Sequence, residues 1–301
     1  TGYFRLAYKQ TIGQHVPSQL RNTSKTDIVE SIFGKLGVIA SRVYFEDATP
    51  LDSTINLALE AKQPKVLSTP KPTTFQHYLR QPDLPNIKSL NHWNLDCDIR
   101  GYKLYWHKYQ DNTTDPGEFD WEDNNAVEDR IHTRIKPILP KTKFTGRIRF
   151  DNLTKEELGA LLFALDLPEN HYHKLGMGKP LGLGTVKITP KLHLCDRKKR
   201  YSELFAEDDW QLAENTADIK TYKNAFEKYI LDRLSNEEKG AAKSLWEVTR
   251  LKHLKAMMEE PTNPDWNEIT SYMQIEPRNE YKMRPVLPDP LKVKQQNRGR
   301  R

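Results

Sequence analysis

The sequence predicts an α+β fold: a ferredoxin-like core with large insertions, followed by a mainly helical C-terminal segment. Three observations predict it. Residues 143–150 alternate apolar and polar side chains as a strand does, and a helical apolar repeat follows Thr154. A glycine-rich stretch then leads into a second alternating segment over 186–194. The order strand, helix, glycine loop and strand matches half of a ferredoxin-like fold.

The N-terminal part contributes fewer regular elements and carries the insertions, which are expected over about 50–140. An apolar cluster occupies residues 28–34, and a strand is expected over 38–45 with Arg42 in it. Residues 62–72 are rich in Pro, Lys, Ser and Thr, which is typical of an extended loop. The acidic stretch 115–129 is predicted to be an exposed insertion.

The unit over 143–168 carries the clearest periodicity. In its strand, one face is predicted to hold Phe144, Gly146, Ile148 and Phe150, and the other Thr145, Arg147 and Arg149. Thr154 and Glu157 fit a capping box at the start of the helix. The buried stripe of this helix is predicted to be Leu158, Leu161, Leu162 and Leu165, and Pro168 stops the helix.

Four glycines fall within nine positions after that helix: Gly176, Gly178, Gly182 and Gly184. A Walker A loop is excluded because Lys179 is followed by Pro180 rather than Ser or Thr. The dinucleotide fingerprint is excluded by the spacing and by the order of helix and strand. Two readings stay open: a turn that reverses the chain, and a loop whose amides, with Lys179, cradle phosphate.

The C-terminal part changes character after a basic run at 197–200. Residues 201–260 are expected to be mostly helical, with one strong helix over 241–258. The basic residues 292–301 are expected to be disordered alone. We therefore divide the chain into a core with insertions, residues 1–195, and a helical extension with a basic tail, residues 196–301.

Composition favours a polyanionic partner. The 301 residues carry a formal charge of +6 with a mean hydropathy of −0.79. With two cysteines and no CxxC pair, a four-cysteine zinc site is excluded, and no structural metal is expected. No apolar run approaches the ~20 residues of a membrane span. We expect no membrane partner and a reducing, cytoplasmic location.

Basic and aromatic side chains alternate over residues 98–108. If this segment is a strand, Tyr102, Leu104 and Trp106 share one face and Lys103, Tyr105 and His107 share the other. One face must be buried. We favour the second face for stacking and for contact with RNA.

Several pieces together resemble one family. Ile32-Phe33-Gly34, followed by residues 41–48, resembles a pattern of the RAMP proteins (repeat-associated mysterious proteins) of CRISPR systems. Residues 99–107 and the end of the chain, 272–288, resemble a RAMP subfamily associated with type III systems. The stretch 176–184 resembles the glycine-rich loop of the RAMP domain.

The resemblance implies an RRM-like domain that polymerises along a CRISPR RNA and holds it for pairing with target RNA. The implied partners are guide CRISPR RNA, target RNA, and other RAMP and effector subunits. Some relatives cut the target with an aspartate and a divalent cation, Mg²⁺ or Mn²⁺. The family's first strand, and any catalytic aspartate loop beside it, are expected to precede Thr1.

These implications give a set of candidate residues. The groups expected to hold RNA phosphates and sugars, or to stack on bases, are Gly176, Gly178, Lys179, Gly182, Gly184, Arg42, Arg100, Lys103, Tyr105, His107, Arg147 and Arg149. Asp96 and Asp98 are the candidate catalytic pair, with a solvated acidic turn as the alternative. The function expected is a type III backbone subunit, with or without a target-cutting site. The alternative is a stand-alone RAMP endoribonuclease that processes precursor RNA, metal-dependent or with His92, His107 and His132 as acid and base.

Overall fold

The computed structural model describes residues 8–21, 24–52, 57–67, 69, 71–82, 87–110, 121–123, 132–203, 213–273 and 279–298. The α-helices are α1 (Ile28–Phe33), α2 (Lys155–Leu165), α3 (Arg197–Ser202), α4 (Ile219–Leu231), α5 (Asn236–Lys239), α6 (Thr249–Met258), α7 (Trp266–Ile269) and α8 (Pro290–Arg298). The strands are β1 (Val43–Phe45), β2 (Thr49–Pro50), β3 (Phe144–Thr145), β4 (Ile148–Phe150), β5 (His173–Lys174), β6 (Thr185–Val186), β7 (Leu192–Cys195) and β8 (Glu214–Ala217). Short 3₁₀ turns lie at Ile12–His15, Ser18–Leu20, Phe75–His77, Ile87–Ser89, Lys179–Leu181, Leu245–Glu247 and Glu280–Met283.

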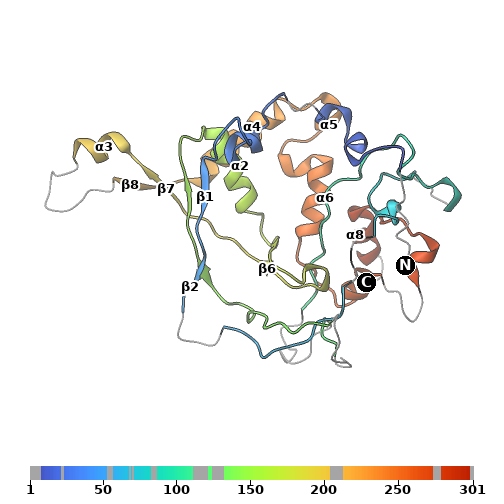
Figure 1. Ribbon diagram of the computed structural model, residues 1–301. Helices are drawn as coiled ribbons and strands as arrows, with labels where there is room; N and C mark the ends of the chain where they lie inside the picture. Colours follow the sequence, from blue (N-terminus) through green and yellow to red (C-terminus); the bar gives the residue numbers. More distant parts are fainter. Residues whose placement is uncertain are drawn as a thin grey trace.

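The strands form four antiparallel pairs, β1 with β4, β2 with β3, β5 with β6, and β7 with β8. In the first pair, Val43 lies opposite Phe150 and Tyr44 opposite Arg149. Opposite residues share a face, so Val43 and Phe150 turn inward together while Tyr44 and Arg149 turn outward. Helix α2 lies beside the β1–β4 pair, and helices dominate the C-terminal part (Figure 1). The predicted α+β class is confirmed.

The core forms where α2 packs on the β1–β4 pair. Ile32, Val43 and Leu161 make one buried cluster, and Phe150 links it to a second cluster of Leu158, Leu162 and Leu192. The predicted capping box is present, with the Thr154 side chain accepting from the amide of Glu157. The leucine stripe of α2 is also confirmed, with Leu165 partly buried.

Helices α2 and α4 pack face to face, and a glycine makes this possible. A Cβ built on Gly159 would lie 2.1 Å from the Tyr222 carbonyl oxygen and 2.8 Å from Phe226 Cβ. Because any side chain at this position would collide with backbone, the two helix axes come closer than they otherwise could. The first long helix of the C-terminal part is therefore packed directly against the core.

Three expected elements differ from the structure. The strand expected over 38–45 is limited to Val43–Phe45, because Lys35 to Ile39 closes a tight turn through Gly37 at φ 73°. The helix expected over 241–258 begins only at Thr249, since Ser244 and Val248 have extended backbone. Residues 292–298 of the tail expected to be disordered alone lie in α8, where Val293 is buried and Lys294 forms an ion pair with Glu259, and residues 299–301 lie outside the described residues.

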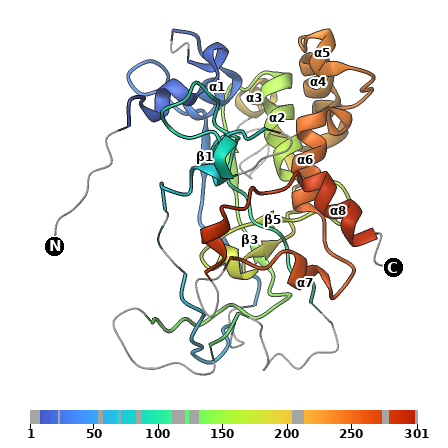
Figure 2. The ribbon, with the colours of Figure 1, turned by 90° about the vertical axis from the view of Figure 1, so that its right-hand side faces the viewer.

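Two segments of the chain continue the β2–β3 pair as a long extension away from the core. Isolated bridges join Ala58 to Ile138 and Lys62 to Ile135, so the two segments run antiparallel beyond the strands. The acidic stretch predicted over 115–129 falls almost entirely outside the described residues. In Figure 2, α6, α7 and α8 lie together on the right-hand side.

Candidate nucleic-acid interface

The glycine-rich stretch is the connection of a β-hairpin between β5 and β6. Gly176, Gly178, Gly182 and Gly184 all have positive φ, between 69° and 100°. A Cβ on Gly184 would lie 1.8 Å from the Leu175 carbonyl oxygen. Positive φ disfavours other residues at all four positions, and the close approach to backbone excludes any side chain at Gly184, so the path of the backbone accounts for the glycines.

The hairpin uses its amides unequally. The amides of Leu181 and Leu183 donate to the Gly178 carbonyl, and that of Gly182 donates to Lys179. Within the described residues, the amides of Gly176 to Gly178 have no acceptor, and Met177 beside them is 85% exposed. Lys179 Nζ donates to the Gly176 carbonyl at 2.6 Å. The exposed tip thus offers adjacent N–H groups and one cation, a combination that suits phosphate oxygens.

Lys174 holds the hairpin from its inner side. Its Nζ donates to the carbonyls of Gly182 at 2.7 Å and Leu183 at 3.1 Å, and to Thr185 Oγ1 at 3.1 Å. Burial, followed by the positive charge of Lys108, lowers the pKa of Lys174 to about 8. Because the Lys174 ammonium group donates its hydrogen bonds to the hairpin, this lysine stabilises the loop and is not assigned to RNA contact.

Lys108 and His107 tie the hairpin to the C-terminal part. Lys108 Nζ donates to the carbonyls of Asn267 and Thr270, and its Cγ occupies the space that a Cβ on Gly182 would fill. One ring nitrogen of His107 lies 3.0 Å from Thr185 Oγ1 and the other 3.0 Å from the Tyr172 carbonyl. Trp266 Nε1 donates to the His107 carbonyl. This clamp joins the glycine hairpin, the 106–109 segment and α7.

The face assignment for residues 98–108 needs correction. His107 is 3% exposed, whereas Tyr102, placed on the buried face, is 98% exposed. Apart from the bridge of Ile99 to Leu79, this segment joins no strand within the described residues. Its side chains contact different parts of the molecule one by one, so a strand with two faces does not describe their burial. We therefore leave His107 out of the interface and keep Lys103, whose Nζ lies 5.1 Å from the Tyr105 ring.

The three arginines of the β1–β4 region differ in their surroundings. Arg42 donates to the Ser31 and Asn152 carbonyls and pairs with Glu157, so its guanidinium is used inside the fold. Partial burial opposes ionisation of Glu157, but hydrogen bonds from Arg42, Thr154 and Ser31 outweigh it and lower its pKa. Arg149 is exposed and pairs with Glu46 at 2.7 Å, and Arg147 is exposed beside it.

The candidate catalytic pair lies on a turn supported by His15. The buried His15 ring contacts the carbonyls of Cys97 and Trp93, and the Arg80 amide donates to the Asp98 carbonyl. Across the residues that the structure describes, no three His, Cys, Asp or Glu side chains are grouped to hold a metal ion. Asp96 and Asp98 are therefore not part of a preformed group of this kind among the described residues.

Arg100 is tied to the C-terminal strap over 279–289. Its Nη2 donates to the Pro288 carbonyl at 3.0 Å, and His77 contacts the Pro285 carbonyl. Arg284 of the same strap donates to Thr73 and lies over the Phe75 ring at 4.7 Å. The end of the chain thus fastens the region that carries Asp98 and Arg100.

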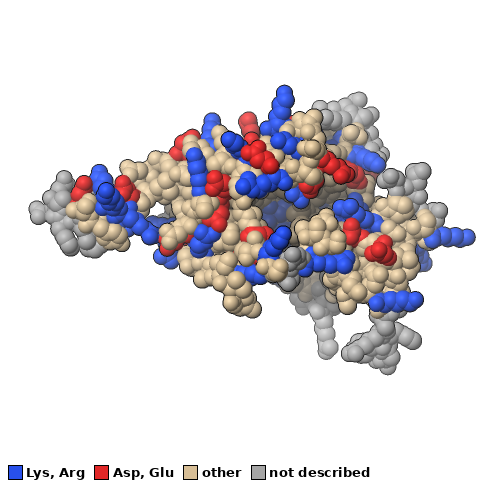
Figure 3. Space-filling model, turned by 90° about the horizontal axis from the view of Figure 1, so that it is seen from above, with Lys and Arg blue, Asp and Glu red and all other residues tan. Residues whose placement is uncertain are grey.

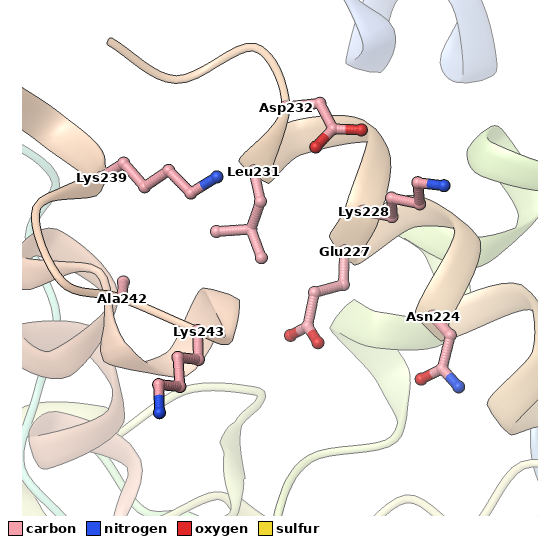
Figure 4. Close-up of a pocket in the computed structure, with 8 residues that line it drawn as sticks. All are labelled: Asn224, Glu227, Lys228, Leu231, Asp232, Lys239, Ala242 and Lys243. Atoms are coloured by element: carbon pink, nitrogen blue, oxygen red, sulfur yellow. The ribbon is translucent and has the colours of Figure 1, made fainter. Parts of the chain in front are cut away.

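A shallow pocket lies elsewhere, between α4 and the α5 region (Figure 4). Its charged lining is of mixed sign: Glu227, Lys228, Asp232, Lys239 and Lys243. Glu227 is already engaged, since it accepts the Leu245 amide at 2.8 Å. The pocket contains none of the predicted RNA-binding residues, so we do not assign it to the interface.

Three residues of the site were missed by sequence reasoning: Lys174, Lys108 and Trp266. Lys174 sits in a two-residue strand, too short for a periodic signal, and the alternation over 98–108 does not indicate which partners Lys108 has. The role of Lys108 depends on carbonyls more than 150 residues away in the sequence. Only the tertiary structure reveals them.

Comparisons with known proteins give the family. The RAMP superfamily pattern matches residues 2–187, which is more than half of the chain. A comparison with curated proteins found no match. None of the described helices is both long and apolar enough to cross a membrane. The matched range contains the core helix, the β1–β4 pair and the whole glycine hairpin. The chain belongs to the RAMP superfamily.

Proposed function

We propose that this chain is a backbone subunit of a type III CRISPR ribonucleoprotein, which binds guide RNA and holds it for pairing with target RNA. Membership of the RAMP superfamily supports RNA binding within CRISPR systems. The observation that carries the proposal is the hairpin tip, with adjacent amides that lack acceptors within the described residues and with Lys179 beside them. Such groups hold phosphates and leave base edges free for pairing.

Other exposed groups extend this contact. Arg147 and Arg149 lie on the outer face of the β1–β4 pair, and Lys103 and Tyr105 lie near the exposed Tyr102. Seen from above, Lys and Arg are interspersed with Asp and Glu, and the surface is hollowed near its centre (Figure 3). With mixed charges, we expect RNA to follow particular basic groups instead of one continuous positive face.

The alternative is a stand-alone endoribonuclease with histidines as acid and base. His107 is buried with both ring nitrogens engaged, and burial, followed by the Lys174 charge, lowers its pKa to about 4. His92 packs near Phe75, and His132 lies 3.9 Å from Asp123. These different neighbours favour the subunit. Purification as a monomer that cuts free repeat RNA would support the alternative.

Replacing Lys179 with alanine is expected to weaken RNA retention and its dependence on salt. Losing one contact to single-stranded phosphate reduces the slope of log affinity against log salt by about 0.7. Binding titrations at several salt concentrations measure this slope. Lys252→Ala, an exposed lysine on α6, is the matched control. Equal slopes for Lys179→Ala and the control would exclude a phosphate contact at Lys179.

Target cleavage by an assembled complex tests the candidate aspartates. We expect Asp98→Ala to abolish cleavage while retention of guide RNA stays unchanged, because a carboxylate that positions a cation is not needed to hold the strand. The readout is cleavage of labelled target RNA, with Asp232→Ala, a change at an exposed carboxylate at the end of α4, as the control. Normal cleavage by Asp98→Ala removes this residue from the catalytic assignment.

A further inference from the structure

The β7–β8 pair leaves the body of the molecule as a narrow arm that carries α3 (Figures 1 and 3). At its root, Leu194 and Ala217 pack on the second core cluster, to which Leu192 belongs, and Arg197 at the start of α3 forms an ion pair with Asp151. A two-stranded ribbon is marginally stable alone. An arm that extends this far from the core is therefore suited to contacting something outside the described chain.

Helix α3 concentrates positive charge on this arm. The Asp196 side chain caps it, and four consecutive cations follow at 197–200. Arg197 reaches back to Asp151, and Arg200 Nη1 lies 3.9 Å from Cys195 Sγ. Lys198 and Lys199 are exposed, and neither ammonium is paired with a carboxylate among the residues described. Within the described part of the arm, α3 thus presents two exposed lysines.

An aromatic side chain accompanies them. Tyr201 is 69% exposed and follows Lys198 by three positions, so the two lie on the same side of α3. The exposed strand residues of the arm are mostly polar: His193, Cys195, Glu214, Asn215 and Thr216. Cations beside an exposed ring suit phosphates and a base. The polar strands lack the apolar centre that a protein interface needs.

We propose that this arm is a second RNA-binding surface, separate from the glycine hairpin. Lys198 and Lys199 contact phosphates of single-stranded RNA, and Tyr201 stacks on a base. The inference rests on the proposed function only in taking RNA as the polyanion. It adds a contact on a part of the chain outside the region matched to the RAMP superfamily, since α3 begins at Arg197 and that match ends at residue 187.

The test compares two variants with the same change in charge. Lys198→Glu/Lys199→Glu alters the arm, and Lys220→Glu/Lys252→Glu alters exposed lysines of α4 and α6. Acidic residues in the first turn of α3 are compatible with the helix dipole, so the fold should persist, and circular dichroism checks this. The probe is a mixed-sequence, fluorescent single-stranded RNA, titrated with the full chain at 50 and 200 mM salt.

The arm variant should lose two phosphate contacts, which lowers the salt slope by about 1.4 and makes the affinity loss between the two salt concentrations about sevenfold smaller. Tyr201→Ala should weaken binding about fivefold or more at both salt concentrations, because stacking does not release counterions. Arm and control variants with equal slopes would overturn the proposal. So would an arm variant that binds RNA normally but no longer co-purifies with another subunit.

Running Lys179→Ala in the same titration separates the two proposals. A reduced slope for Lys179→Ala with a normal arm variant leaves the hairpin contact standing and removes the arm contact. The reverse result keeps the arm as an RNA site and removes the hairpin contact.

Discussion

Replacing Gly159 with alanine is expected to destabilise the protein by about 2 kcal/mol. The added methyl group would sit 2.1 Å from the Tyr222 carbonyl oxygen, so α2 and α4 must separate. Overpacking of this kind costs about 1–3 kcal/mol, and contact with backbone places this case at the upper end. The better helix propensity of alanine offsets about 1 kcal/mol. Urea unfolding measures the difference.

Gly13 provides the control for this substitution. The nearest atom to a Cβ at that position lies 3.8 Å away, and its φ is not positive. We expect Gly13→Ala to change the free energy of unfolding by less than about 0.5 kcal/mol. If Gly159→Ala were as stable as the native chain, the close packing of α2 on α4 would be wrong.

The same helix pair shows what the sequence could predict. The capping box at Thr154 and the leucine stripe of α2 depend on residues three and four positions apart, so the local pattern contains them. Gly159 has no such signal, because its role is set by Tyr222 and Phe226, more than sixty residues away. The helix was therefore predictable, and the reason for the glycine inside it was not.

For the glycine hairpin too, the sequence predicted one part and only the structure shows the other. Four clustered glycines predicted a loop with unusual backbone, and all four have positive φ. The sequence could not decide between a turn and a phosphate cradle. The structure shows that the turn itself favours glycine at all four positions through positive φ and requires it at Gly184, where a Cβ would meet the Leu175 carbonyl. Any phosphate contact is an additional property of the exposed tip, where amides lack acceptors within the described residues.

The alternation over 98–108 gave a wrong face assignment for His107, and the reason is physical. Alternation predicts two faces only if a neighbouring strand pairs with the segment. Here residues 106–109 lie between the hairpin and α7, so burial depends on position along the segment and not on parity. His107 is consequently a structural residue, and its environment has a measurable consequence.

Acidification is expected to destabilise the protein through His107. Burial, and then the Lys174 charge, lower the pKa of His107 from 6.5 to about 4 in the folded chain. Above pH 6.5 the ring is neutral in both states and has no effect on the pH dependence. As the pH falls from 6.5 toward 4, the unfolded state binds the proton first, so stability decreases and then levels below about pH 4. The full change is about 3 kcal/mol.

His107→Gln isolates this contribution, because the glutamine amide can still bond to Thr185 and Tyr172 but does not titrate. Urea unfolding at several pH values between 4 and 7.5 measures both proteins. As the pH falls, the native chain should lose about 3 kcal/mol more of its free energy of unfolding than the His107→Gln variant loses. The exposed His193 is the matched control, and His193→Gln should follow the native curve. Parallel curves for His107→Gln and the native chain would mean that the ring is solvated, and that the clamp between the glycine hairpin and α7 is not closed in solution.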